Sequence, residues 1–309
     1  MWTHAGRLVA ALTAYRAYAM VRPTRVKSVR GWAAVVTGAA GALGAAMARE
    51  LAARGVATLV LWDLHAGELE ELGAGLKRAH PNLVVHVRVV NLADRAAVYA
   101  GAEHALRVCD GKVDLVVNNA GVVAGKLLLE NSDEFDRLTF DVNALAHVWT
   151  AKAFLPAFER RGAGHFCNVS SMASFVATAG MVVYASTKYA ARGFAEGLAH
   201  ELRHRKSDVK VTCVCPSQFQ SKLFDGFFVL GNLAMTAEYV AYRAVEGVEC
   251  ERELVVLPQY LIPALVGMAV AQANGYLNLH GDASNPMQAW KGGEHASRAF
   301  DGMRGAARL

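Results

Sequence analysis

Short Val- and Leu-rich segments alternate with helix-like segments along most of this chain. Clear helical patterns cover 45–54, which is rich in Ala and ends at Gly55, the long run from Ser132 to Phe158, and 189–202. Regular alternation of strands and helices favours a parallel sheet with right-handed crossovers. The sequence therefore predicts an α/β fold, a single-domain, doubly wound parallel sheet with helices on both faces. Its seven predicted strands are 33–36, 57–62, 83–89, 113–117, 165–169, 210–215 and 253–257.

The composition is apolar for a water-soluble protein, with 54% hydrophobic residues, 19% charged residues and a mean hydropathy of +0.22. Ordinary globular chains have about 45–50% apolar and about 25% charged residues, so disordered, collagen-like and coiled-coil classes are excluded. Strands buried on both faces would account for part of the excess of apolar residues, and contact with a lipid surface is the other explanation. The longest uncharged candidate for a membrane span, 254–270, contains Pro258, Gln259 and Pro263, so we expect no membrane-spanning helix.

Charge, cysteine and histidine usage narrow the class further. The net charge of +5 comes without blocks of Arg or Lys, which argues against a nucleic-acid partner. The five cysteines form no CxxC pair, so we expect reduced thiols in an intracellular protein and neither disulfides nor a zinc site. We expect no metal site. Five histidines are interpreted as surface residues or as core residues with satisfied hydrogen bonds, namely His65, His86, His147, His165 and His200.

Both ends of the chain carry features outside the alternating pattern. Residues 1–30 contain no acidic residue, and four apolar residues share one helical stripe, Leu8, Leu12, Tyr15 and Ala19. This extension is interpreted as an interfacial helix, as a targeting peptide such as a mitochondrial one, or as a helix packed on the domain or on a second subunit. The chain ends in a tripeptide that resembles a peroxisomal address and predicts a peroxisome-like organelle, Ala307-Arg308-Leu309.

A glycine-rich turn lies where the first predicted strand meets the first helix. Its residues are Thr37, Gly38, Gly41 and Gly44. A pyrophosphate needs close backbone approach and free N–H groups at a helix N-terminus, and a Cβ here would obstruct both. Asp63 ends the second strand, where a carboxylate accepts from the adenosine ribose hydroxyls and repels a 2'-phosphate. The pattern predicts NAD in preference to NADP, with a structural turn and a solvated Asp as the simpler alternatives.

Tyr184 and Lys188 are four residues apart, which puts them on one face of a helix. A free phenol, with a pKa near 10, is a poor base at neutral pH. An ammonium at about 5 Å favours the phenolate by roughly 3 kcal/mol, or a little over two pKa units. Ser171 follows the strand 165–169, so its hydroxyl is expected to meet Tyr184 over a shared substrate oxygen, with Ser170 as the rival candidate. The pair predicts general acid/base chemistry.

Together these residues resemble the short-chain dehydrogenases/reductases. The matching motif is Thr37-Gly38-x-x-Gly41-x-x-Gly44, Asp63, Asn118-Asn119-Ala120-Gly121, Asn143, Ser171, Tyr184 and Lys188. The stretches 142–156 and 211–216 are similar to the subgroup of lipid-droplet 17β-hydroxysteroid dehydrogenases and microsomal retinol dehydrogenases. The resemblance implies a Rossmann domain over 31–309 and a homodimer. It also implies attachment of 1–30 to a membrane or lipid-droplet surface, with the endoplasmic reticulum as an alternative location.

The resemblance also implies a role for each matching residue. Tyr184 would be the acid/base, Lys188 would lower its pKa and hold the nicotinamide ribose, and Ser171 would bind the substrate oxygen. Asn143 would help to order a water that links Lys188 to solvent. The residues expected at the cofactor are Gly38, Gly41, Leu43, Gly44, Asp63, Asn91, Leu92, Asn118, Gly121, Tyr184, Lys188, Pro216 and Ser221.

Three positions depart from the family pattern. Ala42 stands where the simpler members have their second glycine, so the glycine spacing is closer to extended, epimerase-like relatives. Asn91 replaces the Asp that usually begins the adenine contact, and Ser217 stands where many members have a glycine. Because Gly41 still admits a phosphate and Asn91 keeps an acceptor oxygen, we expect adjusted cofactor affinity and not its loss.

An apolar segment follows Pro216 and predicts a lid over the substrate at about 217–235. It contains Phe219, Phe224, Phe227, Phe228 and Leu230. Such a lid suits a lipophilic alcohol and excludes water, although core or dimer contacts would also explain it. The leading hypothesis is an NAD-dependent oxidoreductase for a steroid, retinoid or fatty alcohol. The alternatives are a non-catalytic nucleotide-binding scaffold at a lipid surface and an epimerase-like extended member of the family.

Overall fold

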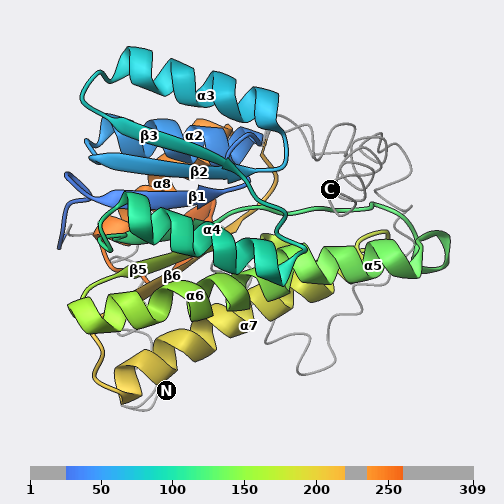
Figure 1. The fold of residues 1–309 in the computed structure, drawn as a ribbon. Coiled ribbons are helices and arrows are strands. Elements are labelled where there is room, and N and C mark those ends of the chain that lie inside the picture. Colours follow the sequence, from blue (N-terminus) through green and yellow to red (C-terminus); the bar gives the residue numbers. More distant parts are fainter. Residues whose placement is uncertain (1–25, 220–234, 260–309) are drawn as a thin grey trace.

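Seven parallel strands form one sheet at the centre of the computed structural model, which describes residues 26–219 and 235–259 (Figure 1). Their order is β3-β2-β1-β4-β5-β6-β7, and all neighbours pair in parallel. The bounds are β1 Ala33–Thr37, β2 Thr58–Asp63, β3 Val84–Val89, β4 Leu115–Asn118, β5 His165–Val169, β6 Lys210–Pro216 and β7 Leu254–Leu257. The predicted doubly wound sheet is confirmed, with strand ends within two residues of expectation.

Helices follow the strands and cover both faces of the sheet. Three of them are α2 Ala42–Ala53, α3 Ala66–Ala79 and α8 Ala237–Glu249, and on the opposite face lie α4 Arg95–Val108, α6 Ala146–Arg161 and α7 Val182–His204. Figure 1 shows α4, α6 and α7 in front of the sheet, with α2 and α8 behind it. Two short 3-10 turns are η1 Leu128–Glu130 and η3 Met172–Ser174.

Alternation along each strand divides the apolar residues between the two faces. In β1, Ala34 and Val36 pack with α2 and α8, whereas Val35 packs with the residues of α4 and α6. Successive strand side chains point to opposite sides, so a sheet covered on both sides needs apolar residues at every position. This is why β1, β4 and β5 are buried along their whole length, and it accounts for much of the apolar surplus.

The long helical run predicted from Ser132 to Phe158 is divided into three parts. Ser132 caps α5 (Asp133–Phe140), because its Oγ accepts from the N–H of Phe135 at 3.2 Å. A π-helical turn, η2 (Asp141–Leu145), then separates α5 from α6. Such turns occur frequently at functional sites, and this one contains Asn143. The predicted helical run is therefore present and continues to Arg161, but it contains a π-helical turn that its apolar spacing does not reveal.

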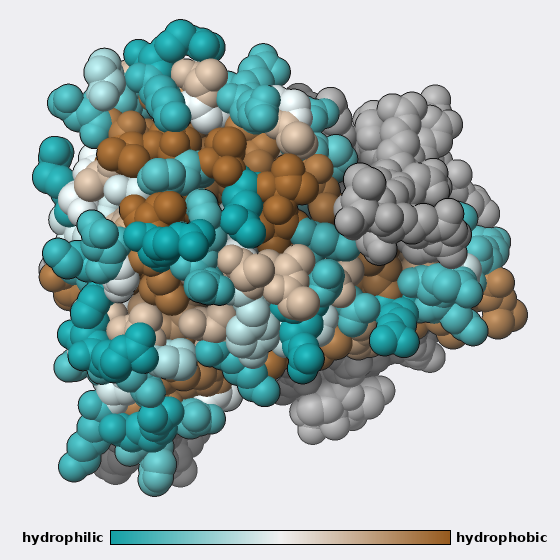
Figure 2. All heavy atoms as spheres, in the orientation of Figure 1, coloured by the Kyte–Doolittle hydropathy of each residue, from teal (hydrophilic) through white to brown (hydrophobic). Residues whose placement is uncertain are grey.

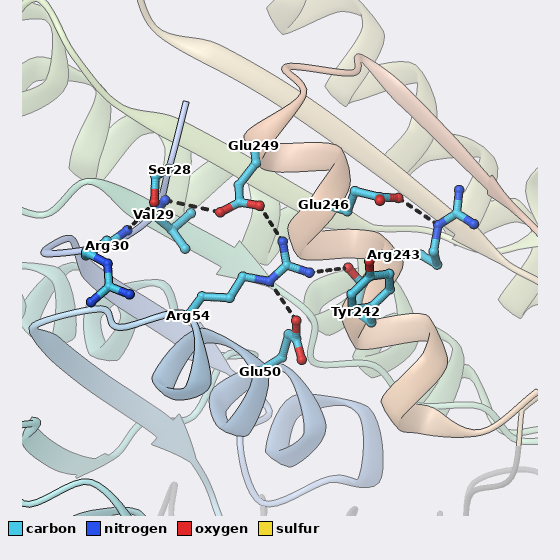
Figure 3. A network of polar contacts seen from close by, with 9 residues as sticks. All are labelled: Ser28, Val29, Arg30, Glu50, Arg54, Tyr242, Arg243, Glu246 and Glu249. Carbon is cyan, nitrogen blue, oxygen red and sulfur yellow. Dashed lines mark hydrogen bonds and ion pairs between the residues drawn. The ribbon is translucent and has the colours of Figure 1, made fainter. Parts of the chain in front are cut away.

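An ion-pair cluster holds α2, α8 and the segment before β1 together (Figure 3). Arg54, at the end of α2, bonds to the carboxylates of Glu50 and Glu249 and donates to the carbonyl of Tyr242 at 3.1 Å. Glu249 in turn accepts from the backbone N–H of Val29 at 3.4 Å. Residues 26–29, which the sequence assigned to the extension, are thus fastened to the domain.

Apolar side chains also reach the surface at the edge of the sheet. On the edge strand β3, Val84, Val87 and Val89 are exposed, and Figure 2 shows brown side chains gathered below α3 in this region. In the described ranges, no helix has the length and hydropathy needed to cross a bilayer. Outside these ranges lie the helical stripe of 1–22, the tripeptide at 307–309, Ser221 and most of the predicted lid.

Candidate active site

The glycine turn between β1 and α2 is built by close backbone approach. Gly38 has a φ of +63°, and a Cβ there would lie 2.7 Å from the Cα of Ala120. A Cβ on Gly44 would overlap the carbonyl oxygen of Gly38. Only glycine fits these two positions, because close contact excludes a side chain at both and Gly38 also has the left-handed conformation. Ala42 causes no conflict, since it is simply the first residue of α2 after the cap at Gly41.

The residues that follow β4 are hydrogen-bonded to this turn. The hydroxyl oxygen of Thr37 accepts from the backbone N–H groups of Asn119 at 2.9 Å and Ala120 at 3.2 Å. The Asn119 amide donates to the carbonyls of Thr37 at 3.0 Å and Gly38 at 3.2 Å. Asn119 was not among the predicted site residues, although it belonged to the matching motif. It positions the two strand ends between which the site opens.

Asp63 connects the end of β2 to the glycine turn. Its side chain is 10% exposed, and one carboxylate oxygen accepts from the backbone N–H of Ala40 at 2.9 Å. The other accepts from the N–H of Leu64 at 2.7 Å and lies 3.0 Å from Nδ1 of His65. Asp63 therefore shapes the turn as well as facing the cavity. Sequence reasoning missed this backbone contact, and it also missed that Arg49 and His65 line this end.

A single cavity of about 890 Å³ runs along the carboxyl ends of the strands. It lies beside β1 and β4, where the order of the strands in the sheet reverses, the usual ligand position in such folds. It brings together ten of the predicted residues, namely Gly38, Gly41, Leu43, Asp63, Leu92, Gly121, Ser171, Tyr184, Lys188 and Pro216. This volume is within the range of about 300–1,000 Å³ that small-molecule and cofactor sites occupy.

Two residues expected at the cofactor turn their side chains elsewhere. Asn118 shares the β4 face of Val116, so its amide is directed toward α6 and donates to Asn168 Oδ1 at 2.8 Å, while its oxygen accepts from Thr150 at 2.9 Å. Asn91 accepts from the N–H of Ala93 at 3.0 Å, in the turn before α4. Neither lines the cavity. The motif matched the positions, but the strand alternation decides the side-chain direction.

Ser171, Tyr184 and Lys188 meet at the other end of the cavity. Lys188 Nζ lies 5.6 Å from the centre of the Tyr184 ring and donates to the carbonyl of Val169 at 3.2 Å. Ser171 is hydrogen-bonded to Tyr184. The hydroxyl of Ser170 instead donates to the backbone carbonyl of Lys188 at 2.8 Å, which holds α7 against β5. The geometry favours Ser171 over Ser170 as the hydroxyl beside Tyr184.

Burial dominates the ionisation of this pair. It raises the pKa of Tyr184 to about 12, against a smaller lowering by the Ser171 hydrogen bond. It also lowers the pKa of Lys188 to about 8, while the Cys213 and Cys215 thiols act in the opposite direction. The expectation that Lys188 lowers the pKa of Tyr184 counted the attraction of the ammonium and left out the cost of removing both groups from water, which raises the pKa of Tyr184 here.

Asn143 holds the backbone at Val122, next to the cavity, by hydrogen bonds. Its amide donates to the carbonyl of Val122 at 2.9 Å and to Thr187 Oγ1 at 3.1 Å, while its oxygen accepts from the N–H of Val122 at 2.8 Å. At the neighbouring Gly121, a Cβ would lie 3.4 Å from Lys188 Nζ. Asn143 therefore does not line the cavity, but it holds the segment that passes in front of the lysine.

One of the histidines interpreted as surface or core residues lies in the core on α6. His147 is 1% exposed, and within the described ranges no protein group is hydrogen-bonded to either of its ring nitrogens. The five cysteines are free and four of them are buried, as expected.

Comparison of the sequence with known proteins shows the family to which the chain belongs. The family model described as short chain dehydrogenase matches residues 32–227. Retinol dehydrogenase 10-A of Danio rerio is 34% identical over 267 residues, covering 78% of each chain. Human estradiol 17-beta-dehydrogenase 11 is 35% identical over 237 residues, covering 76% of this chain and 78% of that one.

Solved structures match the fold over most of the chain. A short chain dehydrogenase/reductase from Burkholderia phymatum, in complex with NAD, has a TM-score of 0.73 at 24% identity and covers 81% of this chain and 97% of its own. A metagenomic short-chain oxidoreductase in complex with NADP has a TM-score of 0.62 at 27% identity and covers 74% and 96%. The fold of this chain is thus shared with solved structures of short-chain dehydrogenases and oxidoreductases.

Proposed function

Since this chain belongs to the short chain dehydrogenase family, and is an oxidoreductase, we propose that it interconverts a hydroxyl and a carbonyl group on a lipophilic substrate. One observation carries the proposal. A single cavity joins the glycine turn and Asp63 at one end to Ser171, Tyr184 and Lys188 at the other. A dinucleotide bound along this cavity would have its reactive ring beside a proton donor.

The residues of the cavity fit a nicotinamide dinucleotide. Gly38 and Gly41 leave backbone groups accessible beside the N-terminus of α2, where a pyrophosphate is favoured. When bound, this cofactor would accept or donate the hydride. Asp63 supports NAD in preference to NADP, because its carboxylate would repel a 2'-phosphate. The relatives of known structure include both NAD and NADP complexes.

Proton transfer is assigned to Tyr184. Its phenol would donate a proton to the substrate oxygen during carbonyl reduction and would take the hydroxyl proton during alcohol oxidation. With a pKa raised to about 12, the cofactor-free tyrosine is protonated and is therefore in the state that reduction needs. Lys188 would stabilise the phenolate that oxidation needs, and the Ser171 hydroxyl would hold the substrate oxygen beside Tyr184.

The substrate end of the cavity is largely apolar. Next to Ser171 and Tyr184, the cavity is lined by Met172, Ala173, Val176, Met181 and Phe219. Such a surface favours a lipophilic alcohol or ketone and keeps water from the reacting atoms. Relatives that act on retinol and estradiol support a retinoid, steroid or fatty alcohol as the substrate class.

The test uses the full chain with NAD or NADP, and with all-trans-retinol, estradiol and a long-chain alcohol as substrates. We expect Tyr184→Phe to abolish turnover while NAD binding, measured by calorimetry, stays within twofold. The matched control is Tyr189→Phe, on the same helix but 41% exposed, which should keep full turnover. Full activity of Tyr184→Phe would overturn the proposal. NAD binding without turnover of any alcohol or ketone would instead support the non-catalytic scaffold.

Lipid contact and dimer formation form a separate proposal. It rests on the apolar stripe and basic residues of 1–22 and on the family resemblance, since this segment lies outside the described residues. The full chain should float with phosphatidylcholine vesicles, whereas a chain lacking 1–25 should not. Light scattering of the detergent-free chain should give the mass of two copies, and a monomer would contradict the dimer.

A further inference from the structure

A buried histidine lies below the catalytic pair with both ring nitrogens unpaired in the described part of the chain. His147 lies on α6, one turn after Asn143. Burial, together with the charge of Lys188, lowers its pKa to about 3, so the ring is neutral at physiological pH. A neutral imidazole has one N–H donor and one acceptor nitrogen. Both are expected to find a partner in such a buried position.

A second unpaired group lies in the same buried layer. The Asn168 side chain on β5 is fully buried, and its amide nitrogen has no partner among the described residues. Its oxygen is bonded to Asn118, and Asn118 is bonded to Thr150, which lies one helical turn after His147 on α6. A row of hydrogen-bonded polar side chains thus runs from β5 through β4 to α6.

Lys188 faces this layer from α7. One N–H of its ammonium is bonded to the carbonyl of Val169, the residue that follows Asn168. Within the described residues, only Lys188 acts electrostatically on the pKa of His147. The groups that act on Lys188 are the Cys213 and Cys215 thiols of β6, besides the Tyr184 ring on its own helix. No carboxylate is among them, so the ammonium needs neutral acceptors.

We propose that His147 and Asn168 bind an internal water that accepts a hydrogen bond from the Lys188 ammonium, which makes His147 a positioning residue for Lys188. The water accepts from Lys188 Nζ and from the Asn168 amide, and it donates to the acceptor nitrogen of His147. Three partners are typical of a buried water. The inference deepens the proposed function, because it concerns the lysine on which the Tyr184 phenolate depends.

This water site differs from the role that the family resemblance implies for Asn143. The Asn143 side chain is occupied by Val122 and Thr187, so it has little capacity left for a water. The His147 site would act on the ammonium from the side away from the cavity. By giving the charged form of Lys188 an acceptor, it would oppose the lowering of the Lys188 pKa that burial causes.

The experiment follows the Lys188 titration by NMR in the cofactor-free, full-length chain labelled with ¹³C-lysine, with the signal assigned by Lys188→Met. In His147→Leu, we expect the pKa of Lys188 to fall by about one unit, a tenfold change in its ammonium-to-amine ratio. His147→Gln keeps a donor and an acceptor, and it should stay within about 0.3 units of the wild type. An unchanged Lys188 pKa in His147→Leu would overturn the proposal.

Two checks keep the result interpretable. His165→Leu is the matched control, because this histidine is equally buried but lies at the other end of β5, and an equal fall there would overturn the proposal. If His147→Leu does not fold, His147→Phe replaces it under the same criterion. A high-resolution crystal structure should show a water within hydrogen-bond distance of both His147 and Asn168, and a dry layer would contradict the inference.

Turnover gives an independent measurement. The pH midpoint of alcohol oxidation should move upward in His147→Leu, with kcat at pH 7 reduced by up to about tenfold and KM unchanged. If no chain turns over any alcohol but the Lys188 pKa still falls, the proposed function fails while the positioning role of His147 stands. The two failures are therefore distinguishable.

Discussion

Two buried cations in this protein have opposite surroundings. Arg54 joins α2 to α8 and is bonded to two carboxylates and a backbone carbonyl (Figure 3). Lys188 lies on the other side of the sheet, bonded to one carbonyl and flanked by a tyrosine, two thiols and a neutral histidine. Both side chains are largely withdrawn from water, but among residues 26–219 and 235–259 only the first has counter-charges.

The difference shows where the fold gains stability and where it keeps a reactive group. Arg54 has its charge compensated by two carboxylates, and it joins two helices. A cation without them has its pKa lowered toward neutrality, as Lys188 does, and so responds to small changes nearby. Strongly perturbed groups in a cavity are candidates for catalysis for this reason.

The largest expected effect comes from removing the unpaired cation. Lys188→Met should reduce turnover by about 10²–10⁴-fold, the usual contribution of a proton-transfer system. The unfolding free energy at pH 7 should not fall, because the variant no longer buries a charge without a carboxylate. Kinetics and urea unfolding of the same preparation measure both. A loss of more than about 1 kcal/mol in stability would show that Lys188 is a fastener like Arg54.

Breaking the paired cluster should have the reverse outcome. In Glu249→Gln, Arg54 keeps Glu50 but loses its most buried counter-charge, and we expect a loss of about 3 kcal/mol in unfolding free energy. Turnover per folded molecule should be unchanged, since this cluster lies across the sheet from the catalytic end. Denaturant unfolding and activity at 20 °C test the two statements. A fall in kcat with intact stability would contradict the separation of the two regions.

The pH dependence of stability should also come from the region of Lys188. The folded pKa of His147 is lowered to about 3, below the ordinary value of 6.5. Its contribution is therefore fully present above pH 6.5 and is lost as the pH falls toward 3, by about 1.4 kcal/mol per unit. Unfolding curves between pH 7 and 4 should be flatter for His147→Leu than for the wild type. Parallel curves would mean that His147 is solvated.

These regions differ in how far the sequence predicts them. Val- and Leu-rich strands were recognisable because both faces of the sheet are buried, and the carboxyl ends of parallel strands necessarily meet, which gathers Gly38, Asp63, Ser171 and Tyr184 in one cavity. The direction of the Asn118 side chain was not predictable, since a motif match does not show to which face of the sheet a residue points. The raised pKa of Tyr184 was missed because burial is a property of the packed molecule.

Contacts between distant segments were equally hidden. Nothing local in the sequence pairs Arg54 with Glu249, or places the N–H of Ala40 on Asp63. The π-helical turn at Asn143 interrupts a run whose apolar spacing is typical of one helix. Residue types and spacing indicated the chemistry, whereas the electrostatic state of each group depends on neighbours that only the folded chain brings together.

Cofactor choice gives a smaller expected effect, because Asp63 has two roles. Its carboxylate accepts a hydrogen bond from the glycine turn, and its charge acts on the cofactor. Asp63→Asn keeps an oxygen for the N–H of Ala40 but removes the charge that would repel a 2'-phosphate. The ratio of kcat/KM for NADP to that for NAD should rise about tenfold, or about 1.4 kcal/mol. Steady-state kinetics with both cofactors measure this. An unchanged ratio would leave Asp63 as a support of the glycine turn alone.

The smallest effect is expected at an ion pair that shares the geometry of the Arg54 cluster but not its burial. Arg203 and Glu253 form a contact of 2.8 Å between side chains that are 55% and 50% exposed. Water and salt screen such a pair, so Glu253→Gln should change the unfolding free energy by less than about 0.5 kcal/mol. Measured beside Glu249→Gln, it separates the effect of burial from that of distance. A loss as large as that of Glu249→Gln would show that burial is not the reason why the Arg54–Glu249 ion pair stabilises the fold.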